Sequence, residues 1–254
     1  MLEAAWAGCL ERIPAFFIEN FPSSRTLLIA GPPSLLWALM GLAFAGYLKR
    51  DRGWETGHTR KVFHFLIFGA AALVQHRWGT PGVSLFGGMV SLVILYALVR
   101  GDGHLLYEAM AREKDAPHRT RYIVVPYFAT FLGGVTANIL FGEAAVVGYL
   151  VTGLGDAVGE PVGTAFGRHP YRVPTLTAVK ATRSIEGSSA VFVMCLLAIP
   201  LGAVLTPALH LTAPSWYFIP LMALAAAVVE AVSPHGWDNA ALQIVPAYLA
   251  HIWL

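Results

Sequence analysis

The feature that most constrains this chain is a series of apolar stretches with almost no charge inside them. Of its 254 residues, 56% are hydrophobic and only 13% are charged, and the mean hydropathy is +0.61. A soluble domain carries about 25% charged residues. A chain of this length would therefore lack the polar surface needed to cover a core in water, and the sequence predicts an integral membrane protein.

The apolar stretches predict an all-α, polytopic transmembrane helical bundle of about eight spans, because a helix needs roughly 20 apolar residues to cross the hydrocarbon core. The expected spans are Leu27–Leu48, Val62–Gln75, Val83–Val99, Tyr122–Leu140, Ala144–Leu154, Ser189–Leu205, Trp216–Val232 and Ala240–Trp253. They form a single domain over residues 27–254, since no polar stretch is long enough to fold separately. In residues 1–26, apolar side chains at helical spacing alternate with charged ones, which predicts an amphipathic helix lying at the membrane interface.

Basic residues concentrate in alternate connections. The basic connections are 49–61, 100–121 and 155–188, and the others are 76–82, 141–143 and 206–215. The second set contains Arg77 as its only Lys or Arg. The positive-inside rule places the basic connections in the cytoplasm, so that with eight spans both termini lie outside. We expect a multi-pass protein of the cell inner membrane, and the net charge of +2 is too small to indicate a nucleic-acid partner.

The most informative polar segment contains Asp156 and Glu160, which share one face if the segment is helical. Two neighbouring carboxylates repel unless a cation lies between them, and Mg²⁺ (or Mn²⁺) completed by substrate phosphates is the usual solution. Gly155, Gly159 and Gly163 leave that face without side chains, so that a nucleotide or a neighbouring helix can approach the backbone. The alternative is a packing seam of small residues with Asp156 capping a helix.

Pro161 lies within the same segment and predicts a break in its helix, because proline removes the hydrogen bond to the Ala157 carbonyl. Non-helical backbone at membrane depth is tolerated where it lines a polar cavity. The segment is therefore expected to border such a cavity.

A second segment places Lys180 and Arg183 beside Ser184 and Gly187, a combination suited to phosphate oxygens. Glu186 is expected to bind a second metal, hold Arg183 or orient a hydroxyl. The alternative is an ordinary cytoplasmic flank, in which the basic side chains snorkel and Ser184 caps the following helix.

Arg60, Lys61 and His64 open the second expected span. His64 lies one turn inside the apolar region, where a histidine near its ordinary pKa accepts a proton from an alcohol. The alternative makes Arg60 and Lys61 topology determinants and His64 an interhelical hydrogen-bonding residue, and this is the preferred interpretation of His64.

Asp238 and Asn239 supply oxygen ligands at a short turn between two spans, although turn chemistry alone explains them. Glu230, one turn inside the preceding span, is harder to explain without a function. By contrast, the Arg112–Asp115 cluster is expected to lie in a solvated loop.

Together, these segments indicate phosphoryl transfer to a lipid, carried out by positioning and charge neutralisation. The chain has no Walker A or protein-kinase motif, so a nucleotide site must be of another design.

Over roughly residues 59–246 the chain resembles the dolichol kinase and phytol kinase family, CTP-dependent polyprenol kinases related to phosphatidate cytidylyltransferases. The run Gly155-Asp156 to Glu160-Pro161-Val162-Gly163 is similar to the family's Gly-Asp and Asp-Pro-Val-Gly motifs, and Arg183 to Ser188 is similar to its Lys-Ser-x-Glu-Gly-Ser motif. The residues Arg60-Lys61-x-x-His64 and Glu230 to Asp238-Asn239 resemble its flanking signatures. Glu160 stands where Asp is usual, and Arg183 replaces a point charge with a planar fork.

The resemblance implies CTP, or alternatively ATP, as phosphate donor. It also implies a divalent metal and an isoprenoid alcohol such as phytol, farnesol, geranylgeraniol or dolichol among the membrane lipids. It assigns Asp156, Glu160, Glu186 and Asp238 to the metal, Asp156, Glu186, Arg183 and His64 to catalysis, and Lys180, Arg183, Ser184, Gly187, Gly155, Gly159, Gly163, Asn239, Arg60 and Lys61 to binding. The alternatives are a lipid cytidylyltransferase, a diacylglycerol kinase or a small-solute transporter.

Overall fold

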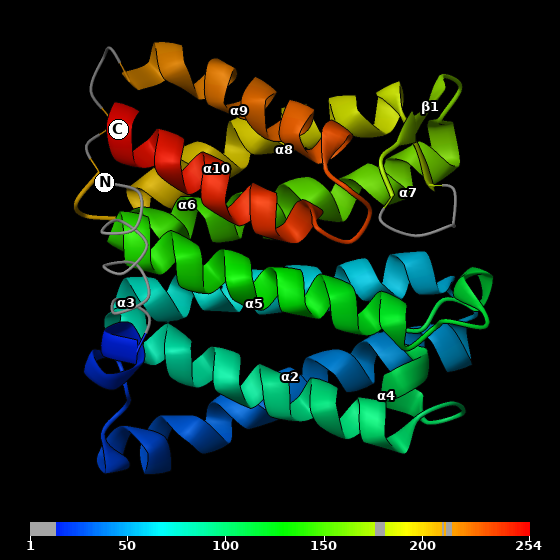
Figure 1. The fold of residues 1–254 in the computed structure, drawn as a ribbon, viewed down its shortest axis with the longest axis horizontal. Coiled ribbons are helices and arrows are strands. Elements are labelled where there is room, and N and C mark those ends of the chain that lie inside the picture. Colours follow the sequence, from blue (N-terminus) through cyan, green and yellow to red (C-terminus); the bar gives the residue numbers. More distant parts are fainter. Residues whose placement is uncertain (1–13, 176–180, 210, 212–214) are drawn as a thin grey trace, which may run out of the picture.

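The computed structural model describes residues 14–175, 181–209, 211 and 215–254, and these are overwhelmingly helical, which confirms the all-α class. The helices are α2 (Ser24–Arg52), α3 (Thr56–Arg100), α4 (Leu105–Glu108), η1 (Glu113–Asp115), α5 (Arg121–Phe141), η2 (Gly142–Ala144), α6 (Ala145–Leu150), η3 (Val151–Asp156), α7 (Ala157–Phe166), α8 (Ile185–Val204), α9 (Ser215–Val232) and α10 (Asp238–Trp253). The long helices run side by side (Figure 1). An antiparallel hairpin of β1 (Pro170–Val173) and β2 (Ala181–Ser184), which the sequence did not predict, precedes α8.

Two continuous helical runs, α3 and Arg121–Phe166, are far longer than a bilayer is thick. Helix α3 has 45 residues, and at about 1.5 Å per residue it would extend more than twice the ~30 Å hydrocarbon core. Gly79 interrupts it with a φ of 65°, a backbone conformation that favours glycine. The two halves of α3 consequently fold back on each other, and the Thr59 hydroxyl donates to the Ala109 carbonyl, which lies beyond the far end of the helix, at 3.0 Å. Gly142, with a φ of 55°, ends α5 in the same way.

Within the described residues, four helical segments are long and apolar enough to cross a membrane: Ser24–Arg52, Thr56–Arg100, Arg121–Phe166 and Ile185–Val204. The segment Trp216–Val232 is a shorter apolar helix. Large apolar side chains on the outside of the bundle are highly exposed, as expected where the surroundings are lipid.

Small residues lie where helices cross. A Cβ atom at Gly202 of α8 would come within 2.9 Å of Val147 Cα, and one at Gly133 of α5 within 2.7 Å of Ala240 Cα. These glycines therefore allow a helix–helix distance that a larger residue would prevent.

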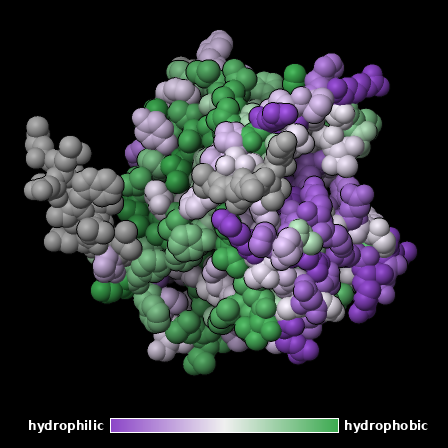
Figure 2. All heavy atoms as spheres, turned by 45° about the vertical axis from the view of Figure 1, so that its right-hand side comes forward, coloured by the Kyte–Doolittle hydropathy of each residue, from purple (hydrophilic) through white to green (hydrophobic). Residues whose placement is uncertain are grey.

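Polar residues gather at one end of the bundle, the right-hand side of Figure 1, which comes forward as a purple surface in Figure 2. Contacts join the connections there. Thr56 donates to Glu113 at 3.3 Å, and Arg112 Nη1 donates to Glu160 Oε1 at 3.3 Å. The three basic connections expected on one side of the membrane thus meet at one end of the molecule, which we call the polar end.

Most of the expected interfacial helix falls on residues 1–13, outside the described residues. Residues 14–19 are helical, and the Phe17 ring stacks on Phe131 of α5 with centroids 6.4 Å apart. Ser23 then caps α2 by accepting the Thr26 N–H at 3.2 Å. The described part of the N-terminal segment therefore packs against the bundle.

Candidate active site

Asp156 and Glu160 lie at a change of helix type. The turn from Val151 to Asp156 is a π-helix, and α7 follows it directly. The expected break at Pro161 is wrong, because α7 continues through this residue to Phe166. Only one hydrogen bond is lost at a proline, and packing of α7 against α8 holds the helix. The irregularity lies before α7 instead, in the π-helical turn Val151–Asp156. Turns of this type are frequent at functional sites.

The glycine face of this segment is covered by α8. A Cβ at Gly155 would lie 2.8 Å from Cys195 Sγ, one at Gly159 would lie 2.9 Å from Val191 Cγ2, and one at Gly163 would lie 3.0 Å from Ser184 Oγ. The three glycines thus form a close packing seam in this structure. The carboxylates of Asp156 and Glu160 are left to face other elements.

Eight charged side chains from different elements meet at the polar end, and we call them the charge cluster. Its cations are Arg60, Lys61, Arg112 and Arg183, and its anions are Asp156, Glu160, Glu230 and Asp238. They come from α3, the 100–121 connection, η3, α7, β2, α9 and α10. Burying this many charges requires that they be paired.

Lys61 lies among three of the carboxylates. Its Nζ is 2.6 Å from Asp156 Oδ2, and both side chains are largely buried. It also lies within electrostatic range of Glu160 and Asp238. His64 Nε2 is 3.4 Å from the same Asp156 oxygen and 3.2 Å from the Thr152 carbonyl. The Lys61 ammonium group therefore has carboxylates around it, as a bound metal cation would.

Arg112 belongs to this cluster, so the expectation of a solvated loop there is wrong. It is only 6% exposed, and its guanidinium contacts Asp115 at 2.8 Å, Glu160 at 3.3 Å and His235 Nε2 at 3.1 Å. The buried side chains of α4 hold the connection against the bundle. The spacing of Arg112 and Asp115, together with the apolar run before them, was the signal that could have revealed this.

His235 lies outside the helices, and its environment favours the neutral ring. Burial and the neighbouring Arg112 charge both lower the pKa of His235. A neutral ring nitrogen accepts a hydrogen bond, which suits the Arg112 N–H group that faces it.

Arg183 joins β2 to the last two helices. Its Nε is 2.8 Å from Glu230 Oε1, its Nη2 is 2.7 Å from Asp238 Oδ2, and Nη1 donates to the Glu230 carbonyl. Burial alone would lower the pKa of Arg183, but the charges of Glu230 and Asp238 outweigh it and raise the pKa. The planar fork thus satisfies contacts that a single ammonium could not.

The remaining predicted site residues lie in other surroundings. Ser184 caps α8 by accepting the Gly187 N–H at 3.1 Å, which confirms the expected cap, although Arg183 is buried in ion pairs and does not snorkel. Glu186 pairs with His169, which directly precedes β1, at 2.6 Å instead of joining the charge cluster. Asn239 donates to Thr130 at 2.8 Å. Lys180 lies outside the described residues.

Among the described residues, no three His, Cys, Asp or Glu side chains lie close enough together to hold a metal ion by themselves. Each of the four expected metal ligands instead faces a basic group: Lys61 for Asp156, Arg112 for Glu160, His169 for Glu186 and Arg183 for Asp238. A Mg²⁺ ion that arrives with nucleotide phosphates needs only one or two protein carboxylates. These residues therefore fit a nucleotide-borne ion better than a resident one.

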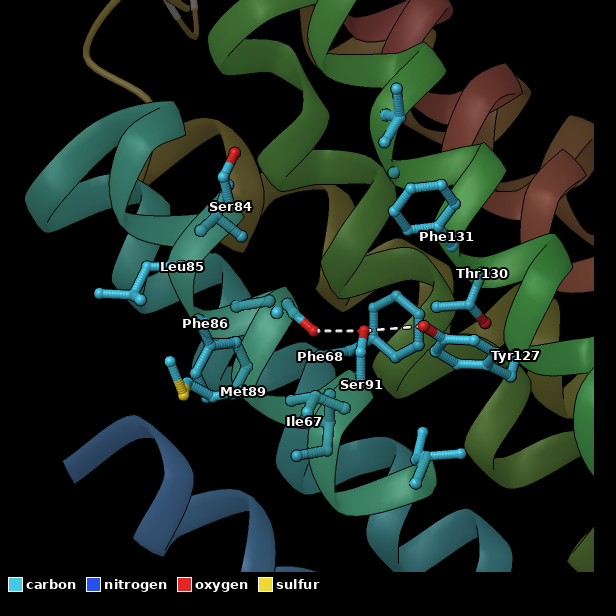
Figure 3. A pocket seen from close by; sticks show the side chains of 18 of the residues that line it. Ile67, Phe68, Ser84, Leu85, Phe86, Met89, Ser91, Tyr127, Thr130 and Phe131 are labelled. Carbon is cyan, nitrogen blue, oxygen red and sulfur yellow. Dashed lines mark hydrogen bonds between the residues drawn. The ribbon is translucent and has the colours of Figure 1, made fainter. Parts of the chain in front are cut away.

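A cavity of about 620 Å³ lies between the two halves of α3 and α5 (Figure 3). Arg60, His64 and Asn239 line it where it borders the charge cluster. Most of its other walls are apolar, including Phe68 and Met89. The volume lies in the range of about 300–1,000 Å³ that is typical of small-molecule sites. The sequence did not reveal this cavity, because its walls come from segments that are distant along the chain.

The chain matches no family model, no curated protein and no solved structure. Its resemblance to the polyprenol kinases therefore depends on the motifs alone. What the protein does has to be argued from the charge cluster and the cavity.

Proposed function

We propose that this protein is a membrane lipid-alcohol kinase that transfers the γ-phosphate of a nucleotide, CTP in preference to ATP, to the hydroxyl of an isoprenoid alcohol. One observation carries the proposal: Arg60, which belongs to the charge cluster, and His64, which contacts that cluster at Asp156, both line the apolar cavity. A lipid chain in the cavity would present its hydroxyl to groups suited to phosphate chemistry.

Exchange of ion-pair partners would admit the nucleotide. Phosphate oxygens accept from the same donors as carboxylates, so Lys61, Arg112 and Arg183 would turn from their acidic partners to the triphosphate. Asp156, with Glu160 and Asp238, would then hold the divalent ion of the nucleotide, which neutralises the charge of the transferring group.

His64 has the best position to receive the proton of the acceptor hydroxyl. Its ring lines the cavity, and its Nε2 lies 3.4 Å from the Asp156 carboxylate and 3.2 Å from the Thr152 carbonyl, so that Nδ1 would be the nitrogen that accepts the proton. Arg60 lines the same end of the cavity, where its positive charge would attract the phosphate group of the product. In this assignment Glu186 stabilises the hairpin through His169.

We also propose about eight membrane crossings. They are α2, the two halves of α3, α5, α6 with α7, α8, α9 and α10. The reversals at Gly79 and Gly142 support this number. The distribution of basic connections supports a topology in which the polar end faces the cytoplasm and both termini lie outside the cell inner membrane. Cysteines introduced at the exposed Asp102 and Glu143 should react with impermeant reagents from opposite sides, and reaction of both from one side would contradict the topology.

The activity is tested with purified protein, CTP labelled in either the α or the γ position, and a panel of alcohols. The γ label should enter a prenol in a metal-dependent reaction. Asp156→Asn should abolish the transfer, whereas Asp102→Asn, a matched change in an exposed ion pair with Arg119, should keep it. Full activity of Asp156→Asn would refute the proposed site.

The same experiment separates the alternatives. Incorporation of the α label with release of pyrophosphate would identify a cytidylyltransferase, and labelling of diacylglycerol in place of prenols would identify a diacylglycerol kinase. Solute flux without nucleotide turnover would identify a transporter. Each of these outcomes excludes prenol kinase activity as the main function.

A further inference from the structure

The cavity has two ends of different character. At the polar end it is lined by Arg60 and His64, and at the other end by Phe16 and Phe17 of the N-terminal segment. At about 1.5 Å per residue, its lining runs for about 16 Å along α3, from Arg60 to Ala71, and for about 22 Å along α5, from Ile123 to Asn138. Half of the ~30 Å hydrocarbon core is about 15 Å. The cavity therefore has room for one chain about as long as a single leaflet is deep.

The cavity also adjoins the lipid-facing surface. A smaller cavity of about 170 Å³ shares Ser91 and Tyr127 with it and is also lined by Leu95, which is 58% exposed. The Tyr127 hydroxyl donates to Ser91 Oγ at 2.8 Å, which joins α5 to the second half of α3 (Figure 3), and both residues line both cavities. A chain entering sideways from the bilayer would pass this hydrogen bond.

Building on the proposed kinase function, we propose that this cavity binds the hydrocarbon chain of the acceptor and limits its length. The acceptor is then an alcohol with one chain of about leaflet depth, such as geranylgeraniol or phytol. Dolichol and the two-chained diacylglycerol exceed the space between Arg60 and the Phe16–Phe17 end.

Two glycines allow a direct test. Gly87 and Gly88 line the cavity on the second half of α3, and a Cβ atom at either position would meet nothing within 4 Å. Leucine has a higher helix propensity than glycine, so substitution retains the helix while it shortens the cavity. Gly69 is a matched control, because a Cβ there also meets nothing within 4 Å but the residue does not line the cavity.

Transfer by the wild type, Gly87→Leu, Gly88→Leu and Gly69→Leu would be measured with farnesol, geranylgeraniol, phytol, dolichol and diacylglycerol. The wild type should prefer geranylgeraniol or phytol over dolichol in kcat/KM by about tenfold or more. Gly87→Leu or Gly88→Leu should shift the preference to farnesol, and Gly69→Leu should keep the wild-type order. An unchanged order in both cavity variants, or efficient use of dolichol or diacylglycerol by the wild type, would overturn the inference.

Binding measured without nucleotide distinguishes failure of this inference from failure of the kinase proposal. Prenols should raise the melting temperature of the detergent-solubilised protein, with a length optimum that the cavity variants shorten. If prenols bind with this length optimum but no phosphate is transferred, the chain-binding site stands and the proposed kinase activity is rejected. Transfer that is insensitive to chain length and to both substitutions would retain the kinase and reject the chain site.

Discussion

Two clusters of buried polar side chains border the same cavity, and they differ in chemistry: one is ionic and the other is neutral. The charge cluster lies at the polar end and consists of ions whose main partners are other side chains. The second group, which we call the amide cluster, consists of Gln75, Asn138, Tyr149 and Gln243. Asn138 accepts from Gln75 at 2.9 Å and donates to Tyr149 and to the Gly134 carbonyl, and Gln243 donates to the Thr130 carbonyl at 3.0 Å.

The two clusters differ in whether a substrate or a metal ion can replace the partners of their side chains. The N–H groups of the neutral amides donate largely to fixed backbone carbonyls and to one another, so that they stabilise helix packing and offer little to a substrate. In an ion pair between side chains, the cation can instead bind a phosphate and the carboxylate can instead bind a divalent ion. We therefore expect the charge cluster to determine activity and the amide cluster to determine stability.

The largest effect is expected from breaking the pair of Lys61 and Asp156. Lys61→Met leaves a largely buried carboxylate without its ammonium partner, which should lower the free energy of unfolding by about 3 kcal/mol and kcat by at least about a hundredfold. The double variant Lys61→Met/Asp156→Asn should recover most of the stability, because no uncompensated charge remains, yet stay inactive. Denaturation in detergent and the transfer assay measure both. Recovery of activity in the double variant would show that the pair has only a structural role.

Asn138→Leu tests the other side of the comparison. The substitution removes the acceptor of Gln75 and the donor to Tyr149, and we expect a loss of about 1–3 kcal/mol in the free energy of unfolding. Activity per folded molecule should stay close to the wild-type level, because Asn138 contributes only to the wall of the cavity and leucine, which is similar in shape, keeps that wall apolar. A selective drop in kcat with unchanged stability would place the amide cluster in the reaction instead.

The sequence revealed the charge cluster better than it revealed its geometry. Local patterns were sufficient for the helical class, for the Ser184 cap and for the small residues at helix crossings, because each depends on a few neighbouring residues. The pairing of Lys61 with Asp156 spans 95 positions, and the burial of Arg112 depends on how a connection packs. The π-helical turn before α7 and the β1–β2 hairpin likewise result from tertiary contacts.

Arg183→Lys should have a smaller effect than loss of the Lys61–Asp156 pair. Lysine retains the charge but cannot bind Glu230 and Asp238 with two separate nitrogens as Arg183 does. We expect KM for the nucleotide to rise about tenfold, the equivalent of one charge-assisted hydrogen bond, with little change in kcat. Steady-state kinetics at saturating prenol would show this. A hundredfold fall in kcat at unchanged KM would instead make Arg183 specific for the transition state.

The smallest effect concerns Glu108, an ion-paired carboxylate of the polar end that belongs to neither cluster. Burial raises its pKa, but hydrogen bonds from Arg119, the Gly103 N–H and Lys49 outweigh this and lower the pKa to about 2, against an ordinary value of 4.5. The unfolded chain therefore takes up the proton first as the pH falls, so that these contacts stabilise the protein fully above about pH 4.5 and progressively less towards pH 2. Glu108→Gln should flatten the acid limb of a melting-temperature profile and leave transfer at neutral pH intact. If the acid limb of Glu108→Gln is as steep as that of the wild type, the loss of stability in acid comes from the carboxylates of the charge cluster. These carboxylates would then contribute to folding as well as to activity.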